Sequence, residues 1–281
     1  MNGTLYLCAT PIGNLGDISA RCLEVLENAD LIAAEDTRRT VQLLNHFGIS
    51  KPLTSYHEHN KREKGEYIIS LLKDGKNVAQ VSDAGTPAIS DPGEDLVKLC
   101  IENDITVTSI PGPVAGINAL ILSGLPTRRF SFEGFLSVNK RHRSEHLNSL
   151  KNDAHTLIFY EAPHKLKTTL ADMASVFGGE RRIALVRELT KLHEEIIRTT
   201  LDGAMSLYSE KSPRGEYVLI LEGASETADE TDEWWTSLSV AEQVEKNIID
   251  GLSSNDAIKK TAANRNIPKR DVYSEYHGLD G

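Results

Sequence analysis

The fold of this chain is decided at Ser82–Gly93, which has the sequence SDAGTPAISDPG. This stretch follows the apolar run Val78–Val81 and places Gly and Pro residues around two carboxylates, Asp83 and Asp91. A strand that ends in such a loop exposes backbone N–H groups and acidic side chains at the carboxyl edge of a sheet, where open α/β folds bind ligands. An ordinary capped turn is the alternative, because turn residues have mechanical uses more often than chemical ones.

A second loop of this kind lies near the amino terminus. The apolar run Leu5–Ala9 leads into Thr10–Asp17, TPIGNLGD, and a third loop, Pro111–Pro113, follows Ile105–Ile110. The first two loops lack the Gly-x-Gly-x-x-Gly fingerprint and the Walker P-loop, which disfavours a pyrophosphate-bearing cofactor or nucleotide hydrolysis. We therefore expect the three loops to line one cleft for a small ligand without phosphate groups.

The order of apolar runs predicts an α/β protein. In the first half, strand candidates alternate with amphipathic helical stretches such as Ile18–Ala29 and Lys64–Lys73, which predicts a parallel sheet. These strand candidates are Leu5–Ala9, Leu31–Ala34, Val78–Val81 and Ile105–Ile110. The second half has more strands and fewer helices, which predicts a mixed sheet. Its strand candidates are Phe130–Phe135, Thr156–Tyr160, Ile183–Val186, Glu195–Thr200 and Tyr217–Glu222.

We predict three segments: an α/β domain with a parallel sheet at 1–122, a second α/β domain with a mixed sheet at 123–224, and a helical C-terminal extension at 225–281. The extension opens with Glu226–Glu233, which carries carboxylates without a base and is typical of a solvated connector. Ser239–Glu242 then predicts a capping box at the start of a helix, and two further helices follow. We expect Trp234 and Trp235 to dock this extension onto the body or onto a second subunit.

Composition excludes several classes of protein. The formal net charge of −10 at pH 7 counts against nonspecific adhesion to nucleic acid, which needs clustered Lys and Arg. The three cysteines are odd in number and lack Cys-x-x-Cys spacing, which argues against a disulfide framework or a zinc site. The sequence shows no signal peptide and no apolar run near the about 18 residues of a membrane span. We therefore expect a cytoplasmic protein that binds no membrane and no metal.

These loops, together with four further motifs, closely resemble the ribosomal RNA small-subunit methyltransferase I family of the tetrapyrrole methylase superfamily. The further motifs are Ala34–Arg38, Tyr160–His164, Arg187–Lys191 and Arg214–Tyr217. The resemblance implies two α/β domains of the tetrapyrrole methylase type, with S-adenosylmethionine in the cleft between them, and a helical C-terminal extension. It also implies a homodimer that methylates the 2′-oxygen of a cytidine in the decoding region of 16S rRNA, with free 16S rRNA or the small ribosomal subunit as substrate.

Positions of the cofactor contacts follow from the matching motifs. A carboxylate and backbone N–H groups at Asp83–Thr86 suit the methionine tail and the adenosine hydroxyls of the cofactor. The full set of expected cofactor contacts is Pro11, Gly13, Asp83, Ala84, Gly85, Thr86, Tyr160 and Gly215. For Tyr160, a half-buried strand aromatic without a cofactor role remains an equal alternative, since Tyr is common in strands.

A ribose hydroxyl becomes a good nucleophile only as its proton leaves, so the reaction needs a positioned proton acceptor. The sequence has no cluster of metal ligands, which leaves side chains for this role. The candidate catalytic residues are Glu35, Asp36, His57 and Glu161. Glu35 and Asp36 suit a second role equally well, as caps of a helix that begins at Thr37 or as partners of Arg38.

RNA contacts are expected at cations that flank the motifs, namely Arg38, Arg39, Lys140, Arg141 and Arg143. Solvated charged loops are the alternative. The cations within Ala257–Arg270 would either meet phosphate or form a solvated helical surface. Two other functions stay open. A tetrapyrrole ring C-methyltransferase would use the same cations to bind carboxylates, and a noncatalytic RNA-binding module would bind no cofactor.

Overall fold

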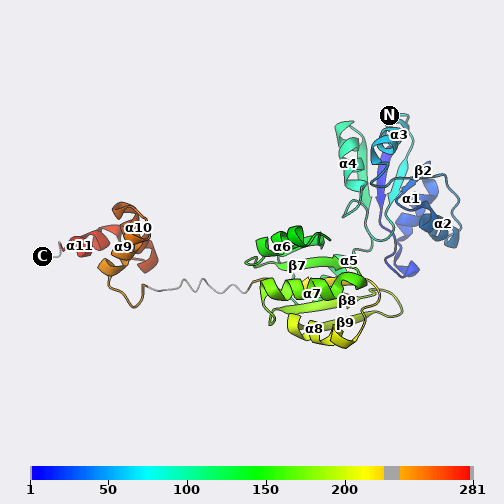
Figure 1. Cartoon of the computed structure of the whole chain (residues 1–281). Coiled ribbons are helices and arrows are strands. Elements are labelled where there is room, and N and C mark those ends of the chain that lie inside the picture. The colour runs from blue at the N-terminus through cyan, green and yellow to red at the C-terminus, as the bar shows by residue number, and fades with distance from the viewer. Residues whose placement is uncertain (1, 225–234, 279–281) are drawn as a thin grey trace. The chain divides into compact units, whose positions relative to one another are not determined.

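The computed structural model describes residues 2–224 and 235–278, and it divides into two compact units, 1–224 and 225–281 (Figure 1). The larger unit contains two five-stranded sheets. The chain passes from the first sheet to the second at Pro111–Pro113, because helix α5 (Ala115–Ser123) already packs on the strands of the second sheet. This crossing lies ahead of the boundary that we placed between residues 122 and 123.

The first sheet is parallel and has the strand order β3-β2-β4-β1-β5. Its strands are β1 (Thr4–Cys8), β2 (Leu31–Ala34), β3 (Leu53–Ser55), β4 (Val78–Val81) and β5 (Thr106–Ile110). From β1 the chain crosses β4 to reach β2, and from β4 it crosses β1 to reach β5. The connections that follow these two neighbouring strands therefore run in opposite directions across the sheet, with α1 (Ala20–Asn28) and α4 (Gly93–Glu102) on opposite faces. Such a switch point is where open α/β sheets bind their ligands.

Helices cover both faces of the first sheet. Helices α1 (Ala20–Asn28) and α2 (Thr37–His46) pack on one face through residues such as Leu26 and Leu44, which meet Ile32 and Ile110 of the sheet. Helices α3 (Lys61–Lys73) and α4 (Gly93–Glu102) cover the other face and pack on Leu5, Ala33 and Val78. All residues of β2 and β4 are buried, as expected for parallel strands between two layers of helices. The predicted parallel sheet is confirmed.

The second sheet is mixed, as predicted, with the order β6-β7-β10-β8-β9. Strands β6 and β7 run parallel, and the other neighbours run antiparallel. Its strands are β6 (Phe130–Phe135), β7 (Thr156–Glu161), β8 (Arg182–Arg187), β9 (Glu195–Thr200) and β10 (Tyr217–Leu221). Alternate side chains of β10 point to opposite layers, because successive residues of a strand face opposite sides.

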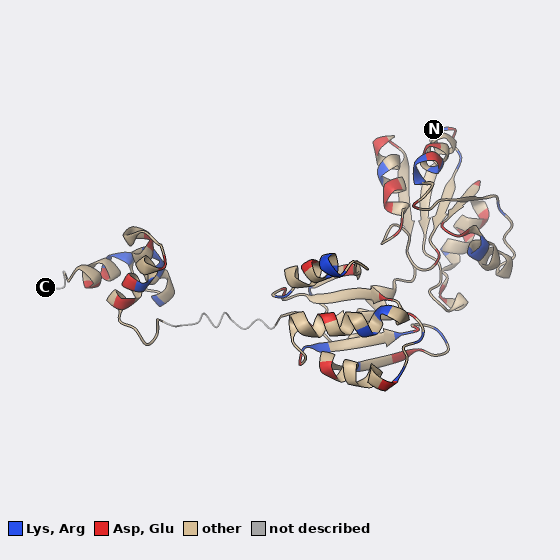
Figure 2. Ribbon diagram, in the orientation of Figure 1, with Lys and Arg blue, Asp and Glu red and all other residues tan. Residues whose placement is uncertain are grey.

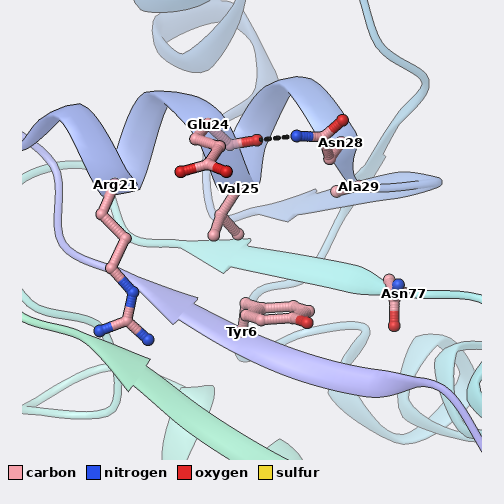
Figure 3. A pocket seen from close by; sticks show the side chains of 7 residues that line it. All are labelled: Tyr6, Arg21, Glu24, Val25, Asn28, Ala29 and Asn77. Atoms are coloured by element: carbon pink, nitrogen blue, oxygen red, sulfur yellow. Dashed lines mark hydrogen bonds between the residues drawn. The ribbon is translucent and has the colours of Figure 1, made fainter.

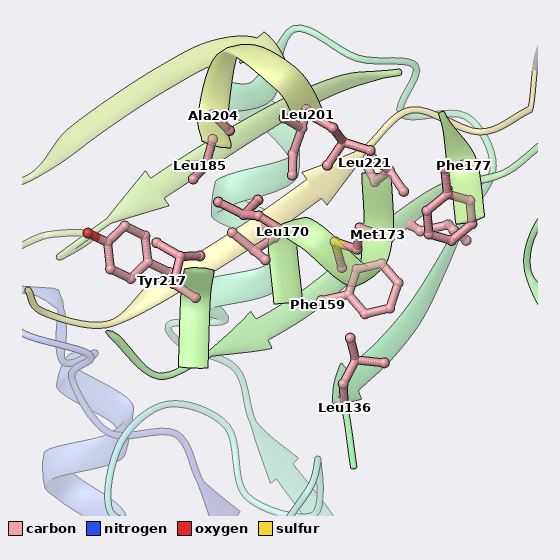
Figure 4. Packing of buried hydrophobic residues seen from close by; sticks show 14 of the residues in the cluster. Leu136, Phe159, Leu170, Met173, Phe177, Leu185, Leu201, Ala204, Tyr217 and Leu221 are labelled. Atoms are coloured by element: carbon pink, nitrogen blue, oxygen red, sulfur yellow. The ribbon is translucent and has the colours of Figure 1, made fainter. Parts of the chain in front are cut away.

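One face of the second sheet packs on helices α7 (Pro163–Phe177) and α8 (Leu201–Glu210). Figure 4 shows this core, in which Phe159 and Leu185 from the sheet meet Leu170, Met173 and Leu201. On the other face, Val218 and Ile220 pack on α5. A further helix, α6 (Lys140–Ser149), follows β6 and packs on α7.

The C-terminal unit is a bundle of three helices, α9 (Val240–Ile249), α10 (Ser254–Arg265) and α11 (Lys269–His277). It has its own core, which includes Val244, Ile258 and Val272. The predicted capping box is confirmed, since Ser239 N–H donates to Glu242 Oε2 at 2.7 Å and Glu242 N–H donates to Ser239 Oγ. The acidic stretch Glu226–Glu233 and Trp234 lie outside the described residues.

Three further observations concern classes of site. No helix in residues 2–224 and 235–278 is long and apolar enough to cross a membrane. Across those same ranges, no group of three or more His, Cys, Asp and Glu residues is placed to hold a metal ion. The three cysteines, Cys8, Cys22 and Cys100, are buried free thiols.

Candidate active site

A cleft of about 590 Å³ lies where the loops of the first sheet face the second sheet. Both halves of the larger unit contribute residues to it, and we refer to it below as the cleft. From the first half it is lined by Ile12, Glu35, Arg39, Ser82–Thr86 and Ile89–Asp91. From the later part of the chain it is lined by Val114, Ala115, Phe135, Tyr160–Pro163, Val186, Leu189, Lys191 and Glu216–Val218.

The three loops that the sequence singled out meet at this cleft. Thr10 N–H donates to the Gly85 carbonyl at 2.9 Å, and Gly85 N–H donates back to the Thr10 carbonyl at 3.0 Å. The Thr86 hydroxyl donates to the Pro113 carbonyl at 3.0 Å, which attaches the third loop. Gly85 has a φ of +82°, a left-handed conformation that a residue with a Cβ rarely adopts. The backbone at Ala84–Thr86 is thereby fixed at the cleft wall.

Asp91 shapes the loop between β4 and α4. Two non-glycine residues of this loop, Ala88 and Ser90, have positive φ values of 67° and 62°, which are strained conformations. The Asp91 carboxylate accepts from Ala88 N–H at 3.0 Å and from Gly93 N–H at 2.7 Å. Burial raises the pKa of Asp91 above its ordinary value, while these N–H groups act in the opposite direction. Asp91 therefore holds the loop in shape at the cleft.

Glu35 and Asp83 form an acidic group in the lining of the cleft. Asp83 Oδ1 accepts from Asp36 N–H at 3.0 Å, and Asp83 Oδ2 lies 3.1 Å from Arg39 Nη1. Burial raises the pKa of Glu35, and the negative charges of Asp83 and Asp91 raise it further. A carboxyl group with a raised pKa can exchange protons nearer neutral pH, which suits a general base.

The structure separates Glu35 from two other candidate bases. Asp36 is the N-cap of α2, accepts from Arg38 N–H at 2.9 Å and pairs with the Arg38 guanidinium at 2.7 Å. Hydrogen bonds from the Arg38 side chain and backbone lower the pKa of Asp36 to about 2. His57 follows β3 and donates its backbone N–H to Asn60 Oδ1. Neither Asp36 nor His57 lines the cleft, so neither is proposed as the base.

The second sheet brings Tyr160 and Glu161 to the cleft. The Tyr160 hydroxyl accepts from Gly116 N–H at 3.0 Å, and its ring packs edge-on against Phe132 and Phe135. Tyr160 is thus both a half-buried strand aromatic and part of the cleft wall. Glu161 is only 4% exposed and accepts from Ala162 N–H and from the Thr169 hydroxyl. One oxygen of Glu161 is hydrogen-bonded at the N-cap of α7 and the other in the middle of that helix, which favours a structural role.

Two of the predicted glycines, Gly13 and Gly215, lie close against the segment Arg187–Lys191. A Cβ on Gly13 would lie 2.4 Å from Lys191 Cγ, and a Cβ on Gly215 would lie 2.5 Å from Glu188 Cγ. Lys191 Nζ donates to Glu188 Oε1 and to Glu216 Oε2, each at 2.9 Å. Gly13 and Gly215 do not line the cleft themselves. Because they lack a Cβ, the segment Arg187–Lys191, which contributes Leu189 and Lys191 to the cleft, can approach them closely. The role of Leu189 and Lys191 as lining residues was not predicted, although both lie in one of the matching motifs.

A smaller cavity of about 180 Å³, the side pocket, opens beside the cleft and shares Arg39, Ser82 and Asp83 with it. Its other lining residues are Thr10, Pro11, Gly13, Leu15, Thr40 and Leu43. Pro11 therefore lies in this pocket and not in the main cleft. A separate cavity of about 250 Å³ involves Tyr6, Arg21 and Asn77 (Figure 3). Because Asn77 precedes β4, this cavity reaches the end of the sheet opposite the three loops. None of its lining residues is a predicted site residue.

The five predicted RNA contacts occupy different environments. Arg38 is exposed and paired with Asp36, whereas Arg39 lines both the cleft and the side pocket. Lys140 and Arg141 are exposed at the start of α6. Arg143 is buried, donates to Asp172 Oδ2 at 2.6 Å and to the Ser137 carbonyl at 3.0 Å. Because its guanidinium is buried and hydrogen-bonded to other parts of the fold, Arg143 is not available to phosphate. We therefore no longer expect Arg143 to contact RNA.

Replacement of Arg143 should therefore affect stability. We expect Arg143→Ala to lower the free energy of unfolding by about 1–3 kcal/mol, since it leaves Asp172 and a carbonyl without their donor. The exposed Arg141→Ala is the matched control and should change it by less than about 0.5 kcal/mol. Urea titration followed by circular dichroism measures both values. Equal free energies of unfolding in the two variants would mean that Arg143 does not stabilise the fold and could contact RNA as first expected.

Comparison with known proteins shows that this chain is similar to methyltransferases. The family model for tetrapyrrole (corrin/porphyrin) methylases matches residues 4–204. A ribosomal RNA small subunit methyltransferase I from Halalkalibacterium halodurans is 50% identical, covering 98% of this chain and 95% of that protein. Proteins of the same name from Bacillus subtilis and a Synechocystis strain are 49% and 46% identical, and they cover 98% and 96% of this chain and 94% and 96% of their own lengths.

Solved structures show the same fold at low identity. Diphthine synthase superposes with a TM-score of 0.59 and 14% identity over 78% of this chain and 90% of that one. A uroporphyrin-III C-methyltransferase from Thermus thermophilus, complexed with S-adenosyl homocysteine, gives a TM-score of 0.55 and 16% identity over 78% and 97%. The predicted fold class, two α/β domains of this type with C-terminal helices, is confirmed.

Proposed function

The chain belongs to the ribosomal RNA small subunit methyltransferase I family of tetrapyrrole methylases, and from that premise we propose that it methylates the 2′-oxygen of a cytidine ribose in small-subunit ribosomal RNA. The observation that carries this proposal is the sequence identity of 50% and 49% to two relatives of that name, each over 98% of this chain. The decoding region of 16S rRNA is the proposed location of the cytidine, and the cytoplasm is the proposed compartment.

S-adenosylmethionine is the methyl donor, and the residues of the cleft fit it. A volume of about 590 Å³ lies within the about 300–1,000 Å³ usual for small-molecule sites. Glu35 and Asp83 supply negative charge for the ammonium and sulfonium groups, and the apolar side chains of Val186, Leu189 and Val218 suit the adenine ring. When bound, this cofactor would supply a methyl group that a nucleophile attacks in line, with neutral S-adenosylhomocysteine as the leaving group.

The chain's own residues position and activate the ribose. Glu35 is the proposed acceptor of the 2′-hydroxyl proton, because it lines the cleft and its pKa is raised toward neutral pH by burial and by Asp83 and Asp91. Ala84–Thr86 present a backbone that the Thr10–Gly85 and Thr86–Pro113 hydrogen bonds hold rigid. Rigid support of this kind favours the geometry that an in-line displacement requires.

A homodimer is proposed for the larger unit. Helix α5 and the edge strand β6 expose Ile117, Ile121, Phe130 and Phe132, of which Ile121 is 64% exposed. These residues lie on elements that adjoin, because a Cβ on Gly116 of α5 would lie 3.6 Å from the Phe132 ring. Exposed apolar side chains on adjoining elements favour a protein interface, and β6 is in addition an edge strand of its sheet.

The C-terminal unit is a proposed RNA contact. Lys259 and Lys260 are exposed on α10, and Figure 2 shows Lys and Arg on the helices of this unit. Arg265 is excluded from this role, because its guanidinium donates to Gln243 Oε1 and to the Trp235 and Leu238 carbonyls. It fixes the segment before α9 instead.

Loss of both lysines should weaken RNA binding through its electrostatic part. We expect the double variant Lys259→Gln, Lys260→Gln to reduce the slope of log affinity against log salt concentration by about 1–2, since each phosphate contact contributes about 0.9. The double variant Lys73→Gln, Lys76→Gln, at the end of the first sheet away from the cleft, is the control. Fluorescence titration of labelled RNA at several salt concentrations measures the slope. An unchanged slope assigns these lysines to a solvated surface.

Labelled methyl transfer tests the proposed function. The protein is incubated with methyl-labelled S-adenosylmethionine and one of three acceptors: unmodified small ribosomal subunits, free 16S rRNA, or a reduced tetrapyrrole. Label in RNA supports the proposal and identifies the better acceptor. Label in the macrocycle would make the protein a ring C-methyltransferase, and binding of RNA without any transfer would make it a noncatalytic RNA-binding module.

A further inference from the structure

The side pocket has no assigned occupant, although three of its lining residues also line the cleft. Because Arg39, Ser82 and Asp83 line both cavities, a molecule in either cavity can contact these three residues. At about 180 Å³ the side pocket is below the about 300–1,000 Å³ of usual small-molecule sites, which suits a single aromatic ring better than a whole cofactor. We infer that the side pocket receives the base of the target nucleotide and that the Asp83–Arg39 pair reads its Watson–Crick edge as cytosine. This inference rests on the proposed function.

The walls of the side pocket match a flat ring with one polar edge. Pro11, Leu15 and Leu43 supply apolar surface, and Leu15 is 41% exposed, so it offers contact area that the fold itself leaves uncovered. Its charged lining residues are Arg39 and Asp83, which can form hydrogen bonds to the edge of a ring. A nucleobase taken out of its stack is usually held in this way, by apolar contacts on its faces and hydrogen bonds on its edge.

The Asp83–Arg39 pair places an acceptor beside a donor. Asp83 Oδ2 lies 3.1 Å from Arg39 Nη1, and Asp83 Oδ1 accepts from Asp36 N–H, which fixes the orientation of the carboxylate. A carboxylate has about four lone-pair positions and a guanidinium has five N–H donors, so both groups can bond a ligand without breaking their own pair. The carboxylate is already held in this orientation and loses little freedom when a ligand binds, and Arg39, whose side chain is 67% exposed, is accessible to the same ligand.

Cytosine complements this arrangement. Its amino group N4 is a donor that Asp83 can accept, and its ring nitrogen N3 is an acceptor for Arg39. Uracil in the same position would direct a carbonyl oxygen at the Asp83 carboxylate and an N–H at the Arg39 guanidinium. Two acceptors and two donors would then face each other. Unmatched polar groups of this kind are the means by which a site rejects a near-isosteric ligand.

The position of the side pocket also accounts for where the ribose lies. Glu35 and Arg39 both line the cleft, and the negative charge of Asp83 acts on Glu35, so the three side chains are neighbours. A base held at Asp83 and Arg39 leaves its own ribose at the mouth between the side pocket and the cleft. That placement presents the 2′-hydroxyl to Glu35 while the cofactor occupies the rest of the cleft.

Discrimination between cytidine and uridine tests the inference. Two small-subunit RNA substrates that differ only at the target, cytidine or uridine, are methylated under single-turnover conditions by the full chain and by Arg39→Gln. The glutamine amide both donates and accepts, so it tolerates either base. We expect the cytidine-to-uridine rate ratio to fall by about 10- to 100-fold, the discrimination that one two-bond base contact provides. The affinity for S-adenosylhomocysteine is measured in parallel by calorimetry, because Arg39 also lines the cleft.

Control variants separate the outcomes. Arg21→Gln removes an arginine from the separate cavity of Figure 3 and should change neither the ratio nor the affinity. Leu43→Phe narrows the side pocket without touching the ion pair, and it should raise KM for RNA while cofactor affinity stays constant. These variants keep the inference testable should Arg39→Gln fail to fold.

Each alternative result has its own meaning. An unchanged cytidine-to-uridine ratio in Arg39→Gln, with normal KM in Leu43→Phe, would overturn the base assignment while the proposed function stands. A loss of S-adenosylhomocysteine affinity in both variants would assign the side pocket to the cofactor and also overturn it. Absence of methyl transfer to either RNA by the unmodified chain would remove the proposed function itself, and the inference with it.

Discussion

Glu35→Gln is expected to lower the single-turnover rate of methyl transfer by about 10² to 10⁴-fold, the usual contribution of a positioned general base. The amide keeps the size of the side chain but cannot accept the proton of the 2′-hydroxyl. Affinity for S-adenosylhomocysteine should fall only modestly, because Asp83 still supplies negative charge to the cleft. The rates are measured with saturating cofactor and RNA, so that only the chemical step is compared.

The pH dependence gives an independent readout for Glu35. In the unmodified chain the rate should fall as the pH drops through the raised pKa of Glu35, and this acid limb should be absent in Glu35→Gln. The free energy of unfolding should change with pH in the opposite direction to the rate. Because the pKa of Glu35 is higher in the folded than in the unfolded state, its ionisation destabilises the fold as the pH rises through that interval. Glu35→Gln should therefore be at least as stable at neutral pH.

A matched control for Glu35 is Glu24→Gln on α1, which lines the cavity away from the cleft. It should retain the rate and the acid limb of the unmodified chain. Full single-turnover activity in Glu35→Gln would remove Glu35 as the base. It would leave Glu161 as the other candidate carboxylate on the cleft wall, despite its two hydrogen-bonded oxygens.

Asp91→Ala is expected to weaken cofactor binding strongly. The carboxylate holds Ala88 N–H and Gly93 N–H in a loop whose residues Ala88 and Ser90 adopt left-handed conformations, each of which costs about 1–3 kcal/mol. Without these hydrogen bonds the loop should relax, and the wall formed by Ile89 and Ser90 should move away from the cleft. We expect a loss of cofactor affinity of at least about 100-fold, or about 3 kcal/mol.

Calorimetry and thermal unfolding together distinguish a local change from a global one in Asp91→Ala. The melting temperature should fall by only about 2–10 °C, the equivalent of about 1–3 kcal/mol in a domain of this size. Asp74→Ala, at the exposed end of α3, is the control and should leave both quantities unchanged. Retained cofactor affinity in Asp91→Ala would mean that the loop conformation is not part of the binding site.

Strand positions were well predicted from the sequence, because a short apolar run bounded by turn residues is typical of a buried strand. Strands β2, β4, β6 and β9 have the predicted bounds. Strand β3 was not predicted, since Leu53–Ser55 has only three residues and no apolar pattern. Helix α5 was not predicted either. Its sequence AGINALILS is apolar on most sides, and it therefore lacks the helical periodicity that a surface helix shows.

The candidate site was predicted less completely than the fold. Turn chemistry identified the Ser82–Gly93 loop, but the sequence could not distinguish Asp83, which faces the cleft beside Arg39, from Asp91, which holds the loop. Arg143 looked like a surface cation next to Lys140 and Arg141. Its partner Asp172 lies 29 residues away on α7, and no local pattern indicates such a long-range pair.

The chemical position of the transferred methyl group is the most direct test of the central claim. Small ribosomal subunits that carry label from S-adenosylmethionine are extracted, and their RNA is digested with alkali. A methyl group on the 2′-oxygen removes the hydroxyl that alkali needs to cleave the adjoining phosphodiester. We predict that the label appears in an alkali-resistant dinucleotide that begins with cytidine. Label in alkali-released mononucleotides would show base methylation and would contradict ribose methylation by this cleft.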